Sequence, residues 1–109
     1  MKRSELFRLA AMLLASSLTH AGAAEGPAAD AGAGHRRAAV CFACHGERGI
    51  ASLPGTPHLA GQERAYLESA LRAYRDGQAR QNPVMNVMAK PLSDGDIVNI
   101  AAYFSLQKR

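Results

Sequence analysis

The stretch Cys41-Phe42-Ala43-Cys44-His45 decides the fold of this 109-residue chain. Cys-x-x-Cys-His is the pattern of covalent c-type haem attachment. Two thiols three residues apart, at the end of a helix, can each add across one of the two vinyl groups on a haem edge. The adjoining His45 then presents its imidazole to the iron from the same side. The motif therefore predicts one haem c, bound covalently through Cys41 and Cys44, with His45 as an axial iron ligand.

Three other uses of two closely spaced cysteines stay open beside this interpretation. A thioredoxin-like redox pair shares the Cys-x-x-Cys spacing, but it requires a βαβ context that the sequence lacks. A zinc site needs four ligands, and only His35 and His58 could complete the set. A structural disulfide across so short a loop would stabilise the chain little. Export of the chain, which the N-terminus predicts, favours haem, because c-type haem is attached outside the cytoplasm.

The first 23 residues have the composition of a signal peptide. A basic start, residues 1–8, precedes an apolar run at residues 9–18 that is too short to span a bilayer. Small residues then offer cleavage after Ala23 or Ala24. A retained amphipathic anchor helix is the alternative. For a bacterial host we expect export to the periplasm, with no stable membrane insertion after the signal peptide is cleaved.

The charge of the chain excludes one class of partner. The formal net charge is +4, but the expected leader holds three basic residues and one acidic residue. Removing it leaves an excess of +2, which is too small to argue for nucleic acid or an anionic membrane. The length also excludes a multidomain enzyme with a cofactor fold of its own. We therefore expect a single small domain with no nucleic-acid partner.

The rest of the chain predicts an all-α domain with three main helices and two long loops. Residues 24–34 have the composition of a flexible linker, so the folded domain is expected at residues 35–109. Gly77 is expected to end the second helix, and Ser93 to cap the third. Loops this long in so small a domain suggest that they wrap a large planar cofactor. The expected helices lie at residues 35–44, 63–76 and 93–106, and the expected loops at residues 46–61 and 78–91.

The sixth coordination position of the iron has three candidate ligands, which are His58, Met85 and Met88. A methionine thioether favours Fe(II) and raises the reduction potential relative to harder ligand pairs. The segment that holds both methionines lies just before the last helix, where it could reach the opposite face of the haem. One methionine is expected to bind the iron, and the other to pack.

With these motifs in place, the sequence resembles a class I c-type cytochrome. It is close to the short soluble bacterial monohaem members and to half of a dihaem cytochrome c. The resemblance implies a cytochrome c fold wrapped around one covalently bound haem, with Met85 preferred to Met88 as the axial ligand. It covers about residues 38–106 and rests on CFACHG at 41–46, PHLAGQ at 57–62, YL at 66–67, YRDG at 74–77, Met85, LSD at 92–94 and AAYF at 101–104.

The resemblance also implies two contacts in the fold. The backbone carbonyl of Pro57, with Pro54 as its competitor, would accept a hydrogen bond from the second imidazole nitrogen of His45. Such a partner fixes the orientation of the ring and tunes its basicity as a ligand. The N- and C-terminal helices would cross near Val40 and Tyr103.

The site predicts an electron carrier rather than an enzyme. With both axial positions filled by protein side chains, the iron has no open position for a substrate and changes oxidation state with little rearrangement. The expected partners are redox proteins that donate and accept single electrons. Two alternatives stay open: a cytochrome subunit of a larger dehydrogenase or oxidase complex, and a haem enzyme or sensor with a labile sixth ligand.

Overall fold

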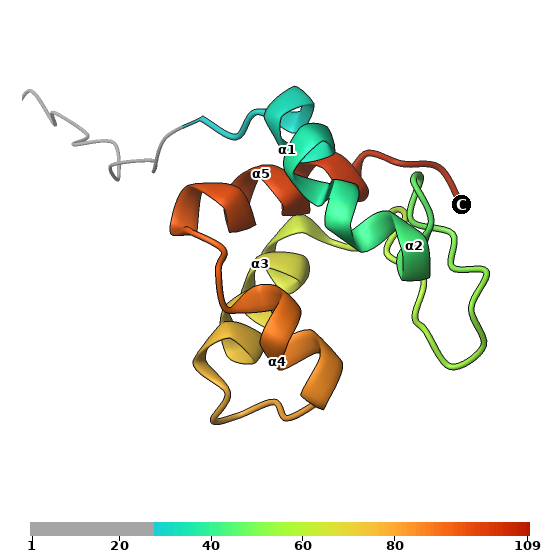
Figure 1. The fold of residues 1–109 in the computed structure, drawn as a ribbon. Helices are drawn as coiled ribbons and strands as arrows, with labels where there is room; N and C mark the ends of the chain where they lie inside the picture. The colour runs from blue at the N-terminus through green and yellow to red at the C-terminus, as the bar shows by residue number, and fades with distance from the viewer. Residues whose placement is uncertain (1–27) are drawn as a thin grey trace, which may run out of the picture.

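The computed structural model describes residues 28–109, so the expected signal peptide lies outside the described residues. Residues 28–109 form helices and loops without a strand, which confirms the all-α prediction (Figure 1). No helix in this part of the chain is long and apolar enough to cross a membrane. The elements are α1 (Ala31–Arg37), a 3₁₀ turn (Ala38–Cys41), α2 (Phe42–His45), α3 (Arg64–Asp76), α4 (Pro83–Ala89) and α5 (Asp94–Ser105).

The first helix begins earlier than the composition suggests. The Asp30 side chain accepts a hydrogen bond from the Ala33 backbone N–H at 3.0 Å, so Asp30 is an N-cap and α1 starts at Ala31. The linker prediction for residues 24–34 is therefore wrong for residues 31–34, which are helical. The helix expected at residues 35–44 is likewise interrupted by the 3₁₀ turn.

Helices α1 and α5 pack against each other (Figure 1), and their backbones come closest at Gly34. A Cβ atom at Gly34 would overlap the backbone carbonyl of Asn99, so only glycine permits this close approach. The Asn99 side chain also accepts a hydrogen bond from the Asp30 N–H at 2.9 Å. The expected packing of the N- and C-terminal helices is confirmed, but the place expected at Val40 is wrong, because Val40 is 51% exposed and the close approach is at Gly34. Tyr103 does lie against α1, with its ring centroid 5.0 Å from that of His35.

The hydrophobic core is small and is supplied mainly by α5. Phe104 and Ile97 are the largest side chains that are fully buried among the described residues. A core this thin stabilises a domain poorly by itself, since little apolar area leaves water. The core cluster consists of Ala38, Leu67, Ala89, Leu92, Ile97, Ile100, Ala101 and Phe104.

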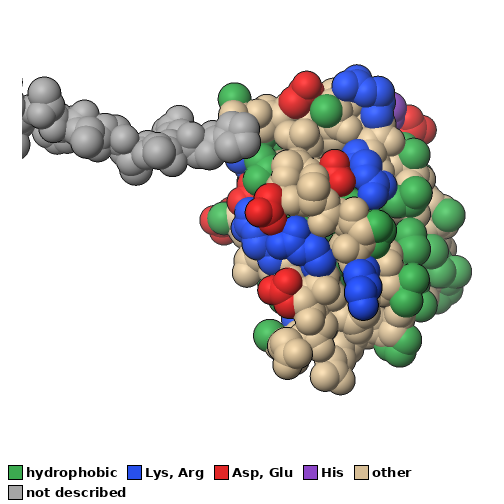
Figure 2. All heavy atoms as spheres, turned by 60° about the vertical axis from the view of Figure 1, so that its left-hand side comes forward, with side chains coloured by type: hydrophobic (Ala, Val, Ile, Leu, Met, Phe, Trp, Pro, Cys, Tyr) green, Lys and Arg blue, Asp and Glu red, His purple; other side chains and the backbone are tan. Residues whose placement is uncertain are grey.

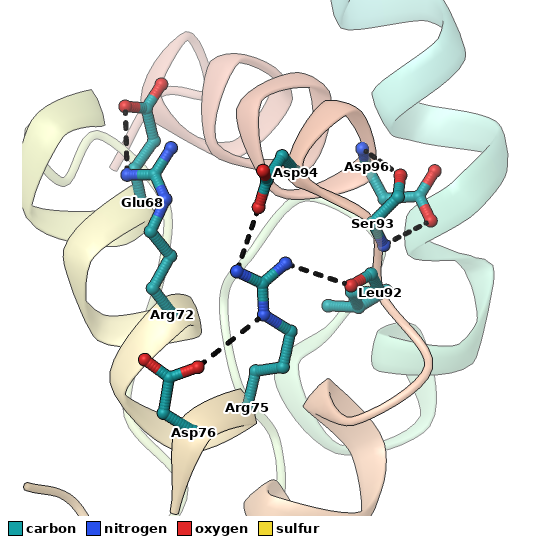
Figure 3. Close-up of polar contacts among 8 residues, drawn as sticks. All are labelled: Glu68, Arg72, Arg75, Asp76, Leu92, Ser93, Asp94 and Asp96. Carbon is teal, nitrogen blue, oxygen red and sulfur yellow. Dashed lines mark hydrogen bonds and ion pairs between the residues drawn. The ribbon is translucent and has the colours of Figure 1, made fainter.

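The start of α5 is fixed by a capping box, which confirms Ser93 as the N-cap. The Ser93 hydroxyl accepts from the Asp96 N–H at 3.0 Å, and the Asp96 carboxylate accepts from the Ser93 N–H at 3.1 Å (Figure 3). Arg37 of α1 lies 3.2 Å from the same carboxylate. The Ser93 N–H and then Arg37 hold the pKa of Asp96 below its ordinary value. The carboxylate thus stabilises the helix start and its junction with α1.

Helix α3 ends at Gly77, as predicted, with a left-handed φ of 71°. Two residues earlier, the Arg75 guanidinium reaches across to the start of α5. It donates to the Leu92 carbonyl at 3.2 Å and pairs with Asp94 at 2.8 Å (Figure 3). Arg75 therefore closes the segment between α3 and α5.

A short helix, α4, replaces part of the loop expected at residues 78–91. The Asn82 side chain accepts from the backbone N–H groups of Val84 and Met85 at 3.1 and 3.0 Å, and Pro83 occupies the first helical position. An asparagine cap followed by proline is a favourable helix start, because proline lacks only an N–H that would be unpaired there. The loop prediction for residues 83–89 is wrong.

Candidate functional site

His45 is buried at the end of α2, with 7% of its surface exposed. Its Nδ1 lies 2.9 Å from the backbone carbonyl oxygen of Pro57, the contact that the resemblance implies; Pro54 is exposed elsewhere on the loop. A carbonyl only accepts hydrogen bonds, so Nδ1 carries the proton. The lone pair of Nε2 is then available to a metal ion, and the ring is held in one orientation.

Pro57 is brought to His45 by a loop that folds back onto Gly49. The Gly49 carbonyl accepts from the N–H groups of Leu59 and Ala60 at 2.8 and 3.1 Å. Gly49 is buried with φ +77°, and a Cβ there would lie 2.6 Å from the Ala60 nitrogen. We call residues 46–63 the His-side loop. Its path depends on a position that only glycine can occupy.

The His-side loop is also fastened to the C-terminal part of the chain. The Gly61 N–H donates to the Phe104 carbonyl at 3.0 Å, and the Arg109 Nε donates to the Ala60 carbonyl at 2.8 Å. The Tyr103 hydroxyl donates to the Glu47 carbonyl. The loop that orients His45 therefore rests on α5 and on the residues that follow it.

The two cysteines lie beside His45 as free thiols, each half-buried. Burial raises the pKa of the Cys41 thiol above its ordinary value, Arg37 acts in the opposite direction, and Cys44 adds to the increase. A raised pKa leaves little thiolate, which is the form that attacks disulfides. The environment of Cys41 therefore disfavours the thiol–disulfide enzyme that the spacing left open.

The zinc alternative also fails within residues 28–109. No group of three or more His, Cys, Asp or Glu side chains in this range is placed to hold a metal ion. His35 Nε2 lies 3.1 Å from the Glu47 carboxylate, and His58 Nδ1 accepts from the Ala51 N–H at 2.8 Å. Within the described residues, neither histidine is grouped with Cys41 and Cys44 as a tetrahedral set requires.

The two candidate methionines lie on α4, which packs on α3 (Figure 1). Met85 precedes the fully buried Ala89 by four residues, so the two share a helix face. Met88 follows Val84 by four residues, and Val84 is 63% exposed. Neither methionine is among the described residues that form the core or pack against it. Both methionines are half-buried, so burial alone does not distinguish them.

Large apolar side chains are exposed on several of the described elements. Figure 2 shows hydrophobic side chains gathered along one edge of the molecule, on the right of that view. An apolar surface of this kind suits a large apolar ligand or a protein partner. The exposed large hydrophobic residues of the described chain are Val40, Ile50, Leu53, Tyr66, Val84, Val87 and Leu106.

The structure thus brings Cys41, Cys44, His45 and Pro57 together and places the methionines on a separate helix. The donor set fits a haem bound covalently on one edge. Cys41 ends the 3₁₀ turn, Cys44 and His45 end α2, and the bond to the Pro57 carbonyl holds the imidazole in one orientation.

Comparison with known proteins gives a consistent result. The family model for cytochrome c matches residues 29–106. Cytochrome c-554(548) of Halomonas halodenitrificans is 48% identical over 74% of this chain and all of its own length. Cytochrome c4 of Pseudomonas aeruginosa is 43% identical over 92% of this chain, which spans about half (48%) of that protein. The crystal structure of reduced cytochrome c4 from Pseudomonas stutzeri matches with a TM-score of 0.70 and 44% identity, covering 74% of this chain and 47% of that one.

Proposed function

Because the chain belongs to the cytochrome c family, we propose that it is a monohaem electron carrier that passes single electrons between redox partner proteins. Its cofactor is covalently bound haem c. When bound, that group supplies a one-electron Fe(II)/Fe(III) couple. Every other part of the function falls to the protein, which must hold the iron ligands and keep the site closed to substrates.

The observation that carries the proposal is the geometry of His45. Its Nδ1 donates to the Pro57 carbonyl, its Nε2 is free, and Cys41 and Cys44 lie within the same turn of chain. In the proposal the two thiols form the thioether bonds, and His45 Nε2 is the first axial ligand. Hydrogen bonding at Nδ1 raises the basicity of the ring and prevents its rotation.

Met85 is proposed as the second axial ligand, with Met88 as the alternative. Two facts support Met85: it shares a face with buried Ala89, and the Asn82 cap holds its backbone N–H. A thioether is a weak, soft ligand, so its position has to be maintained by the protein. With His45 and Met85 both holding the iron, the site would leave no position for a substrate and would exchange electrons only.

The proposal includes export to the periplasm after removal of residues 1–23. Its support is the composition of that segment and the chemistry of haem attachment. The expected partners are redox proteins, with no nucleic acid among them. Since cytochrome c4 is about twice as long as this chain, a place in a larger assembly is the alternative arrangement.

The first experiment is an absorption spectrum of the exported protein, oxidised and reduced. We expect sharp reduced haem bands and, in the oxidised form, the near-red band of methionine sulfur bound to iron. Met85→Ala removes that band and lowers the reduction potential, because the soft ligand is lost. Met88→Ala is the matched control, since it removes an equal side chain from the same helix and leaves the band in place.

Three results would contradict the proposal in different ways. Loss of the band in Met88→Ala alone would exchange the roles of the two methionines. A haem spectrum without the band, altered by carbon monoxide, would indicate a ligand-binding enzyme or sensor. If the exported protein contains no haem, the two cysteines do not bind haem and function as free thiols.

A further inference from the structure

The side-chain amide of Asn86 joins the end of α3 to the start of α4. Its Nδ2 donates to the backbone carbonyls of Tyr74 at 2.8 Å and Arg80 at 3.1 Å. Its Oδ1 accepts from the backbone N–H of Asn82 at 2.9 Å. All three partners are backbone groups, so a single half-buried amide fixes the path of the chain around it.

These backbone groups would otherwise lack partners. The Tyr74 carbonyl belongs to the last turn of α3, where carbonyls have no N–H within the helix to bond. The Gly77 N–H reaches only the Ala73 carbonyl, at 3.0 Å. Asn82 is the N-cap of α4, and its own side chain is already bonded to Val84 and Met85. Asn86 therefore completes the cap of one helix and supports the cap of the next.

Helix α4 depends on such contacts because it has only seven residues. Helices this short do not persist through their own hydrogen bonds, and tertiary contacts must fix them. On its inner side α4 offers buried Ala89, which has a single methyl group with which to resist rotation. Val84 and Val87 are exposed, so they add little. The Asn86 amide is the polar contact that sets how α4 is turned against α3.

We propose that Asn86 is the positioning residue for the methionine ligand of the iron. The amide holds α4 in the rotation that leaves Met85, the preceding residue, half-buried. The inference rests on the proposed function, and specifically on methionine as the sixth ligand. Releasing Asn86 lets α4 turn or fray, and the sulfur then leaves the iron more often while His45 and the thioethers stay in place.

The test compares variants of the haem-loaded, oxidised protein in a titration with imidazole, followed by the near-red band. Asn86→Ala removes all three hydrogen bonds. Asn86→Asp is nearly isosteric and keeps an acceptor for the Asn82 N–H, but it cannot donate to Tyr74 or Arg80. Each lost bond shifts a local equilibrium about fivefold, so imidazole should displace methionine at roughly 25-fold lower concentration in Asn86→Asp, which loses two bonds, and at roughly 100-fold lower concentration in Asn86→Ala, which loses all three.

Asp30→Ala is the matched control. It removes a side-chain cap from α1, which packs on α5 and not on α4, at a similar cost to global stability. The control should lower the unfolding midpoint without changing the imidazole titration. A second readout, independent of the iron, is amide hydrogen exchange: Asn86→Ala should speed exchange in residues 85–89, and Asp30→Ala should not.

The outcomes separate this inference from the proposed function. If the unsubstituted protein lacks the band, methionine is not the ligand, and both fail. If the band is present but the Asn86 variants titrate like Asp30→Ala, only the positioning role is overturned. If Asn86→Asp behaves like the unsubstituted protein, the two donated bonds do not position the ligand, and the inference is equally overturned.

Discussion

The His-side loop and the segment between α3 and α5, residues 77–93, differ in the groups that fasten them. The His-side loop is folded back by bonds between backbone groups: the Gly49 carbonyl accepts from the Leu59 and Ala60 N–H groups, and the Gly61 N–H donates to the Phe104 carbonyl. We call residues 77–93 the Met-side segment. There the fastening groups are the side chains of Asn86 and Arg75.

This difference tells us how each half of the site responds to change. A region closed by backbone contacts has no spare room, so added atoms disrupt it. A region closed by side chains loses its fastening when those side chains are shortened. In the proposed site, the loop that orients His45 is therefore fixed by its backbone, whereas the position of Met85 depends on a few removable side chains.

The largest expected effect comes from adding a methyl group to the His-side loop. Gly49→Ala places a Cβ 2.6 Å from the Ala60 nitrogen and 2.9 Å from the Phe104 ring, at a φ of +77°. Backbone strain and crowding together should cost about 3 kcal/mol of unfolding free energy. Gly77→Ala has the same strain, with no atom closer than 3.9 Å, and should cost about 1 kcal/mol. Urea unfolding of the haem-loaded proteins measures both.

Gly55→Ala is the control that separates crowding from location. Gly55 lies in the His-side loop with φ +80°, and a Cβ there meets nothing within 4 Å. It should therefore cost about as much as Gly77→Ala. Equal losses for Gly49→Ala and Gly55→Ala would show that the His-side loop tolerates added atoms and would remove the proposed contrast.

A smaller effect is expected from shortening the clamp of the Met-side segment. Arg75→Ala removes the bonds to the Leu92 carbonyl and Asp94 and should cost about 1.5 kcal/mol, since the guanidinium is largely shielded from solvent. Arg72→Ala removes only a 3.8 Å pair with Glu68 on the same helix and should cost about 0.3 kcal/mol (Figure 3). Thermal unfolding of the two variants makes the comparison. Equal decreases in the midpoint of unfolding would show that Arg75 does not fasten the Met-side segment.

The smallest effect is expected at Asp96, at the contact between α1 and α5. The folded pKa of Asp96 is below its ordinary value, so its contribution is present above about pH 4 and is lost as the pH falls through the folded pKa. Asp96→Asn should cost about 0.5 to 1 kcal/mol at neutral pH. It should also flatten the dependence of stability on pH below pH 4, measured by urea unfolding at stepped pH. If stability falls as steeply below pH 4 in Asp96→Asn as in the unsubstituted protein, other carboxylates cause that loss.

The sequence was sufficient to predict the parts of the fold that depend on local patterns. The spacing of the two cysteines and His45, the stop at Gly77 and the cap at Ser93 each follow from neighbouring residues. Helix α4 was missed because Pro83 and Pro91 gave its segment the composition of a loop. The signal was nevertheless present, since Asn82 followed by Pro83 is a favourable helix start.

Other features depend on distant parts of the chain and could not be predicted. Gly34 lies in a run of alanine and glycine, and only its approach to Asn99, 65 positions later, distinguishes it. The three bonds of Asn86 need the turn between two helices to exist first. When all the partners of a side chain are backbone groups, no residue type in the sequence indicates where those partners are.

The contact between His45 and Pro57 has a consequence for protein chemistry. Every amino acid carries the same carbonyl, so saturation mutagenesis at position 57 leaves the acceptor in place and reports only on the preferred backbone angles of the loop. The acceptor itself can be altered only in the main chain. Semisynthesis that places an ester between residues 57 and 58 would weaken this carbonyl as an acceptor without touching any side chain of the site. The influence of the main chain on the iron would then be measurable apart from that of every encoded residue.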